Sequence, residues 1–143
     1  GVVKGGTVSD AVVTSTDFYP TMLDLAGLKA KPRQHVDGKS FTCVLKQTGT
    51  VDRQAVYWHY PHYGNQGGSP GGAVRLGDWK LIEFYEDNRA ELYNLKKDIG
   101  EKNDLAAKMP ERVKKLRDML HTWRKEVDAK MPTPNPNYKP RVR

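Results

Sequence analysis

Two histidines and an arginine lie around a glycine-rich segment in the middle of the sequence, and their side chains could do chemistry. His59 and His62 are separated by Tyr60-Pro61, and Arg75 follows the segment YGNQGGSPGG. A histidine titrates near neutral pH, so it can act as an acid or base or donate a hydrogen bond to an ester or hydroxyl oxygen. An arginine guanidinium can bind carboxylate or sulfate oxygens through two parallel hydrogen bonds.

The segment between these residues could bring a ligand close to the backbone. Its glycines tolerate positive φ angles, and the amides of Asn65 and Gln66 both donate and accept, as sugar hydroxyls require. The segment lacks the GxxxxGK[ST] order of a phosphate-binding loop. The sequence therefore predicts that His59, His62, Asn65 and Arg75 contact a sugar or an anion. Three alternatives stay open, namely a hairpin connection without function, a solvated arginine, and histidines bonded to backbone groups.

The residues favour neither a metal site nor a nucleophile. A metal site needs at least a third ligand near the two histidines, and no compact His/Asp/Glu cluster supplies one. The single cysteine, Cys43, excludes an intrachain disulfide, and its apolar neighbours favour a small buried side chain over a reactive thiolate. No GxSxG motif occurs, and the carboxylates Glu83 and Glu86 are interpreted as surface charge on a hairpin. We expect no catalytic residue and no metal ligand in this chain.

The elements that must position the loop are predicted from periodicity. QAVYWHY is typical of a strand, and GAVRLGDWKLIEFYED predicts two further strands joined by a turn at Gly77-Asp78. A fourth strand is predicted around Leu92 to Leu95. Apolar residues between Met109 and Val127 recur at steps of three, four and seven, which indicates an amphipathic helix of about five turns. The pattern predicts an α+β fold, a small antiparallel sheet of about four strands packed by a long C-terminal helix.

The chain divides into three parts by composition. Residues 1–50 are expected to hold a strand end at 11–14, a helix over 16–27 and a loop, with Gly27 ending the helix. Phe18, Met22 and Leu25 fall on one face of that helix. Residues 51–131 form the sheet and the long helix. Residues 132–143 alternate proline with polar residues, which predicts an extended tail.

The charge is strongly positive but dispersed. The sequence holds 24 Lys and Arg against 17 Asp and Glu, a formal net charge of +7, which favours anionic partners. The sequence contains no run of five like charges, so it does not indicate a nucleic-acid-binding arm. No apolar run approaches the ~20 residues that span a bilayer. We expect neither nucleic acid nor a membrane as a partner.

Several segments, in order along nearly the whole chain, resemble the C-terminal portion of the type I, formylglycine-dependent sulfatases. These segments are GVVKGGTVSDAVVTSTDFYPTMLDLAGL, VDGKSF, AVRLGDWKLI, ELYNLKKDIGEKNDLA and MPERVKKLRDMLHTW. HYPHYGNQGGSPGGAVR is especially similar to bacterial carbohydrate sulfatases of the N-acetylgalactosamine-6-sulfatase and arylsulfatase A types.

The resemblance implies a parent protein that hydrolyses sulfate esters of carbohydrates and is periplasmic or secreted. The family makes formylglycine from a C/S-x-P-x-R motif, but Cys43 is followed by Val-Leu-Lys, so it is not that site. Calcium and formylglycine are therefore implied for a missing N-terminal domain of alkaline-phosphatase-like α/β fold, whose tail would be residues 1–50. We expect this fragment to pack on that domain, to be inactive alone, and to contribute a substrate-binding rim through the four residues named above.

The alternative is a free-standing carbohydrate- or anion-binding module. The helix over 16–27 distinguishes the two hypotheses. An independent module would bury the apolar face of this helix, whereas a fragment would leave the face partly exposed.

Overall fold

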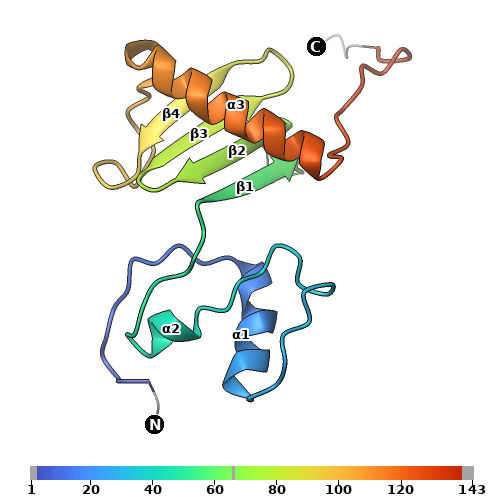
Figure 1. Cartoon of the computed structure of the whole chain (residues 1–143). Helices are drawn as coiled ribbons and strands as arrows, with labels where there is room; N and C mark the ends of the chain where they lie inside the picture. The colour runs from blue at the N-terminus through green and yellow to red at the C-terminus, as the bar shows by residue number, and fades with distance from the viewer. Residues whose placement is uncertain (1–2, 66, 140–143) are drawn as a thin grey trace. The chain divides into compact units, whose positions relative to one another are not determined.

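The computed structural model describes residues 3–65 and 67–139, and the chain divides into two compact units, Gly1–Arg53 and Gln54–Arg143. Figure 1 shows the elements of each unit. The division falls three residues after the end of the first part expected from composition. The tail expected over 132–143 is described only as far as residue 139. Among the helices of the described residues, none is both long and apolar enough to cross a membrane.

The second unit contains the four-stranded antiparallel sheet. Its strands are β1 (Ala55–Tyr60), β2 (Gly71–Leu76), β3 (Trp79–Phe84) and β4 (Ala90–Asn94), and they lie in sequence order. Each strand pairs with the next, so that Tyr57, Val74, Leu81 and Leu92 form one row across the sheet. The predicted α+β class and strand number are confirmed.

One face of the sheet is covered by the long helix α3 (Pro110–Glu126), as Figure 1 shows. Pro110 occupies the start of the helix, where its missing N–H leaves no bond unmade. The core between the layers consists of side chains that are at most 1% exposed: Val74, Leu81, Leu92, Leu116 and Leu120. Complete burial of such a side chain contributes about 2 kcal/mol, so the helix stripe and the sheet face stabilise each other.

The first unit is built around a buried carboxylate. Asp17 is completely buried, accepts hydrogen bonds from the backbone N–H groups of Thr14 (2.7 Å) and Lys39 (2.9 Å), and pairs with the guanidinium of Arg53. Burial by itself raises the pKa of Asp17, but the hydrogen bonds from Arg53, Lys39 and Thr14 outweigh it and lower the pKa to about 2. The charged side chain therefore joins the segments that contain residues 14, 39 and 53.

The helix expected over 16–27 is shorter than predicted. A 3-10 turn (Ser15–Asp17) leads into α1 (Phe18–Leu25). Gly27 ends the helix with a φ of 68°, and the Leu28 N–H donates to the Leu23 carbonyl at 2.8 Å. A short helix α2 (Thr42–Leu45) follows. The strand end expected at 11–14 is not found among the described residues, where these residues pair with no strand, and β-branched side chains alone do not make a strand without a partner.

The apolar face of α1 is largely uncovered. Phe18, Met22 and Leu25 are 51%, 62% and 51% exposed, and Phe18 makes an edge contact with Phe41 at a ring separation of 5.5 Å. The three side chains lie on one face of the helix, as their spacing predicted, but they are only partly covered. An exposed stripe of large apolar side chains usually marks a contact surface.

Candidate functional site

The glycine-rich loop, residues 61–70, joins β1 to β2 and is held at several points. The Gly67 N–H donates to the Gly64 carbonyl at 3.1 Å. A Cβ on Gly64 would lie 2.7 Å from the Gly67 carbonyl oxygen, so this turn requires glycine. The Tyr63 hydroxyl donates to the Glu86 carboxylate at 2.6 Å, and this bond raises the pKa of Tyr63.

His59 lies on the sheet face that α3 covers, and both of its ring nitrogens have partners. Nδ1 is 2.6 Å from the Tyr85 hydroxyl, and Nε2 is 3.0 Å from the Lys130 carbonyl oxygen. Because a carbonyl only accepts, Nε2 carries a proton, and in the neutral ring Nδ1 accepts from Tyr85. This environment matches the alternative in which the histidine is bonded within the protein. Direct contact of His59 with a sugar stays a prediction.

His62 and Asn65 lie on the glycine-rich loop, and both are exposed. The His62 ring makes an edge contact with the Tyr60 ring, with centroids 5.5 Å apart and planes at 85°. Gln66 lies outside the described residues. The two exposed side chains can reach a ligand without breaking a described hydrogen bond.

Arg75 lies on the opposite face of the sheet, which we call the helix-free face. Its Nε donates to the Gly77 carbonyl at 3.1 Å. Arg75 lines an open groove of about 510 Å³ on this face together with Trp58, Tyr60 and Phe84. Lys80, in the same groove, pairs with Glu101 at 2.7 Å.

The four predicted site residues therefore do not form one cluster. His59 belongs to the helix-covered face, Arg75 belongs to the helix-free face, and His62 and Asn65 lie on the loop that connects their strands. Sequence reasoning missed Trp58 and Tyr60, which are 44% and 55% exposed. Strict alternation along β1 was the signal that could have placed these two aromatic side chains on the side opposite His59.

Glu83 is not the surface charge that the sequence suggested. It is 4% exposed and lies on the helix-covered face, where it contacts Arg124 at 3.1 Å, His121 at 2.9 Å and Arg117 at 3.4 Å, all from α3. The expectation failed because alternation in β3 places Glu83 on the same side as Leu81. The cluster pairs the sheet with the helix.

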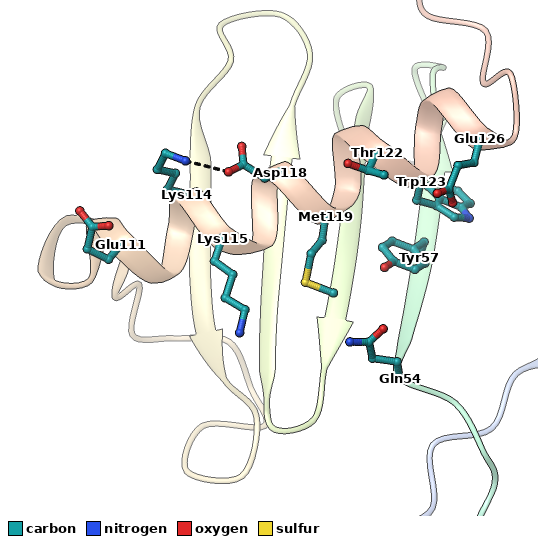
Figure 2. A pocket seen from close by; sticks show the side chains of 10 residues that line it. All are labelled: Gln54, Tyr57, Glu111, Lys114, Lys115, Asp118, Met119, Thr122, Trp123 and Glu126. Atoms are coloured by element: carbon teal, nitrogen blue, oxygen red, sulfur yellow. Dashed lines mark hydrogen bonds and ion pairs between the residues drawn. The ribbon is translucent and has the colours of Figure 1, made fainter.

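A second hollow lies between β1 and the flank of α3, as Figure 2 shows. It has a volume of about 740 Å³, and Tyr57 and Trp123 stack in it with ring planes 7° apart. The helix contributes charges of both signs, and Lys114 pairs with Asp118 at 2.9 Å. Burial raises the pKa of Tyr57, and Glu126 adds to that rise. Because these charges largely offset one another, we interpret the hollow as a solvated helix flank.

The described residues do not fit the calcium and formylglycine that the sequence resemblance implied for a missing domain. Among residues 3–65 and 67–139, no three His, Cys, Asp or Glu side chains come close enough to hold a metal ion. Cys43 lies in α2, and its thiol donates to the Thr50 carbonyl at 3.2 Å. No step of a reaction is therefore derived through either group on this chain.

Comparison with known proteins establishes the family. The chain belongs to the sulfatase family described as "N-sulphoglucosamine sulphohydrolase, C-terminal", whose family model matches residues 1–129. A sulfatase from Formosa agariphila is 35% identical over 138 residues, which cover 86% of this chain and 25% of that protein. An N-acetylglucosamine-6-O-sulfatase from Bacteroides thetaiotaomicron is 33% identical over 132 residues, covering 82% of this chain and 22% of that protein.

The fold has a solved counterpart as well. A structure of a protein in complex with its substrate D-glucosamine-2-N,6-O-disulfate matches with a TM-score of 0.73 and 31% identity, over 89% of this chain and 27% of that one. The chain thus spans about a quarter of the length of the proteins it matches, and it corresponds to the C-terminal part of a sulfatase. The sugar named for two of these proteins is glucosamine, whereas the sequence resemblance suggested galactosamine.

Proposed function

We propose that this chain serves in a carbohydrate sulfatase, which hydrolyses a sulfate ester to a sugar hydroxyl and inorganic sulfate. The family match over residues 1–129 is the observation that carries the proposal. The names of the relatives favour a sulfated glucosamine as the substrate class. The described residues offer polar side chains on the glycine-rich loop, so their proposed part is recognition of the sugar.

In this proposal, the glycine-rich loop forms part of the rim of the active site. His62 and Asn65 hydrogen-bond the hydroxyl or amide groups of the sugar, since both side chains are exposed on the loop. Arg75 binds a negatively charged group, because its guanidinium lines the groove on the helix-free face. His59 acts through the structure of the loop, since both of its ring nitrogens already have partners.

The proposal also includes packing on a catalytic α/β portion that supplies calcium and formylglycine. Two surfaces support such packing. The first is the helix-free face, where Trp58 and Tyr60 are exposed, and the second is the apolar face of α1, where Met22 is 62% exposed. A free-standing binding module would be expected to cover that helix face, so its exposure favours the sulfatase fragment.

The experiment compares this chain with the product of the complete reading frame of its gene, which the proposal expects to be a longer protein. Both are assayed for sulfate release from a sulfated glucosamine and from an aryl sulfate. We expect turnover only by the longer protein. Turnover by the 143-residue chain alone would overturn the claim that the chemistry lies elsewhere. A longer protein that cleaves no sulfate ester would overturn the proposed function.

Variants of the longer protein test the loop. Asn65→Ala and His62→Ala remove side chains that are proposed to touch the sugar, so KM for the sugar sulfate should rise while hydrolysis of a small aryl sulfate changes little. Lys97→Ala is the matched control, because Lys97 is also exposed but lies beyond β4. Equal effects of all three variants would contradict the placement of the sugar at the loop.

A further inference from the structure

We infer that Tyr85, which no sequence motif singled out, is the residue that positions the glycine-rich loop. Tyr85 follows the last residue of β3 and contacts both ends of the loop. Its backbone N–H donates to the Pro70 carbonyl at 2.9 Å, where the loop ends. Its side-chain hydroxyl lies 2.6 Å from Nδ1 of His59, two residues before the loop begins. One residue thus ties the two strands together at the point where the loop leaves them.

The hydroxyl of Tyr85 can reach His59 because Gly72 leaves room for it. A Cβ on Gly72 would come well inside 3.0 Å of the Tyr85 oxygen, 3.3 Å from its Cζ and 3.2 Å from the Trp58 carbonyl oxygen. In the strand pairing, Gly72 lies directly opposite His59. The second glycine of SPGG is therefore explained by the tyrosine that crosses over it.

The surroundings keep Tyr85 protonated and in place. Burial raises the pKa of its hydroxyl, which Arg124 only partly opposes, so the group donates hydrogen bonds at neutral pH. The Arg124 guanidinium lies 5.2 Å from the centre of the Tyr85 ring and pairs with the buried Glu83 at 3.1 Å. The far side of His59 is bonded to the Lys130 carbonyl, just beyond α3. These contacts connect the base of the loop to the helix on the covered face.

This arrangement has a consequence for binding that rests on the proposed function. His62 and Asn65 project from a loop whose two ends are fixed, so less conformational entropy is lost when they order around a sugar. A five-fold change in affinity corresponds to about 1 kcal/mol, which is about the cost of ordering one such side chain. Tyr85 is a positioning residue in this scheme, since it acts through the loop and not through the ligand.

The first test is spectroscopic and needs no substrate. In the 143-residue chain, the variant Tyr85→Phe keeps the ring and the backbone bond to Pro70 but removes the hydroxyl. The side-chain nitrogen resonances of His59, identified by their loss in His59→Asn, should shift because Nδ1 loses its donor. Amide exchange across the loop should speed up several-fold more than exchange in β4.

Tyr93→Phe is the matched control. It removes another hydrogen-bonded tyrosine hydroxyl from the same sheet, since Tyr93 donates to Glu91 at 2.9 Å, but it lies on β4 away from the loop. Unchanged His59 resonances in Tyr85→Phe, or equal loop exchange in both variants, would overturn the positioning role.

The second test concerns the longer protein. There Tyr85→Phe should raise KM for a sulfated glucosamine about five-fold and leave kcat within two-fold, whereas Tyr93→Phe should change neither. If the His59 resonances shift but KM does not, the link from the loop position to sugar binding is refuted. If the longer protein has no sulfatase activity, the proposed function fails while the spectroscopic result still decides the role of Tyr85.

Discussion

The close approach of Gly72 to Tyr85 makes a stability prediction that can be measured as a double-mutant cycle. Gly72→Ala places a methyl group against the Tyr85 hydroxyl, so the hydroxyl must move and its 2.6 Å bond to His59 is lost. Overpacking of this kind costs about 1–3 kcal/mol, and the lost hydrogen bond about 1 kcal/mol more. The lower chain entropy of alanine offsets about 0.5–1 kcal/mol. The net expectation is a loss of about 2 kcal/mol.

The same substitution should cost much less when the hydroxyl is absent. In Tyr85→Phe, the nearest atoms to the new methyl are the ring Cζ at 3.3 Å and the Trp58 carbonyl oxygen at 3.2 Å, which small shifts can relieve. Gly72→Ala in this background should cost no more than about 1 kcal/mol. The expected coupling energy between the two positions is thus at least about 1 kcal/mol, as found for residues in direct contact.

Urea denaturation of the four proteins, followed by far-UV circular dichroism, measures the cycle. Gly100→Ala is the control, because its Cβ would meet only the flexible Lys102 side chain, at 3.5 Å, and it should change stability little. If Gly72→Ala costs the same with and without the Tyr85 hydroxyl, the contact does not explain why glycine is found there, and the reasoning is refuted.

Three further predictions concern the buried charges and the core. Asp17→Asn leaves the Arg53 guanidinium without its anion, and amide exchange at residues 14 and 39 should speed up by at least ten-fold. Because folding lowers the pKa of Asp17 from 3.8 to about 2, this pair contributes about 2 kcal/mol above pH 4, and the contribution is lost as the pH falls toward 2. Glu83→Gln leaves the partly buried Arg124 beside a neutral group and should cost about 3 kcal/mol in urea denaturation. Leu120→Ala, at a completely buried position, should cost about 3 kcal/mol in the same assay.

Each of these predictions has its own contradicting outcome. A first unit whose amide exchange is unaffected by acid between pH 4 and pH 2 would show that Asp17 does not hold it together. The exposed Glu126→Gln serves as the control for Glu83→Gln, and equal costs would mean that burial of the carboxylate has no energetic weight. A cost below about 1 kcal/mol for Leu120→Ala would contradict its place in the core.

The sequence predicted the elements well because their signals are local. Alternation in β1 and β3 and the apolar stripe of α3 each recur within a few residues, so a single segment carries the information. The same local rule gave the apolar face of α1 that contains Met22. Boundaries were less accurate, as in the helix that begins with a 3-10 turn at Ser15.

The site was harder to predict because its contacts are distant in sequence. His59 bonds to Tyr85 and Lys130, which lie 26 and 71 residues away, and no periodicity links such positions. Burial of Glu83 likewise depends on three side chains that α3 brings across the sheet. Arg75 and His59 lie on opposite faces of the sheet because of the register between β1 and β2. That register cannot be predicted from the periodicity of either strand.

Attachment of both loop ends to Tyr85 also bears on how such proteins diversify. Pro70 is bound through the backbone of Tyr85, and His59 through its hydroxyl, so neither contact depends on the identity of the residues between them. Mutation can therefore exchange, lengthen or shorten the segment that carries His62 and Asn65 without disturbing the pairing of β1 with β2. Under the proposed function, a lineage with this architecture can change the sugar it selects by varying one surface segment while selection preserves the sheet beneath.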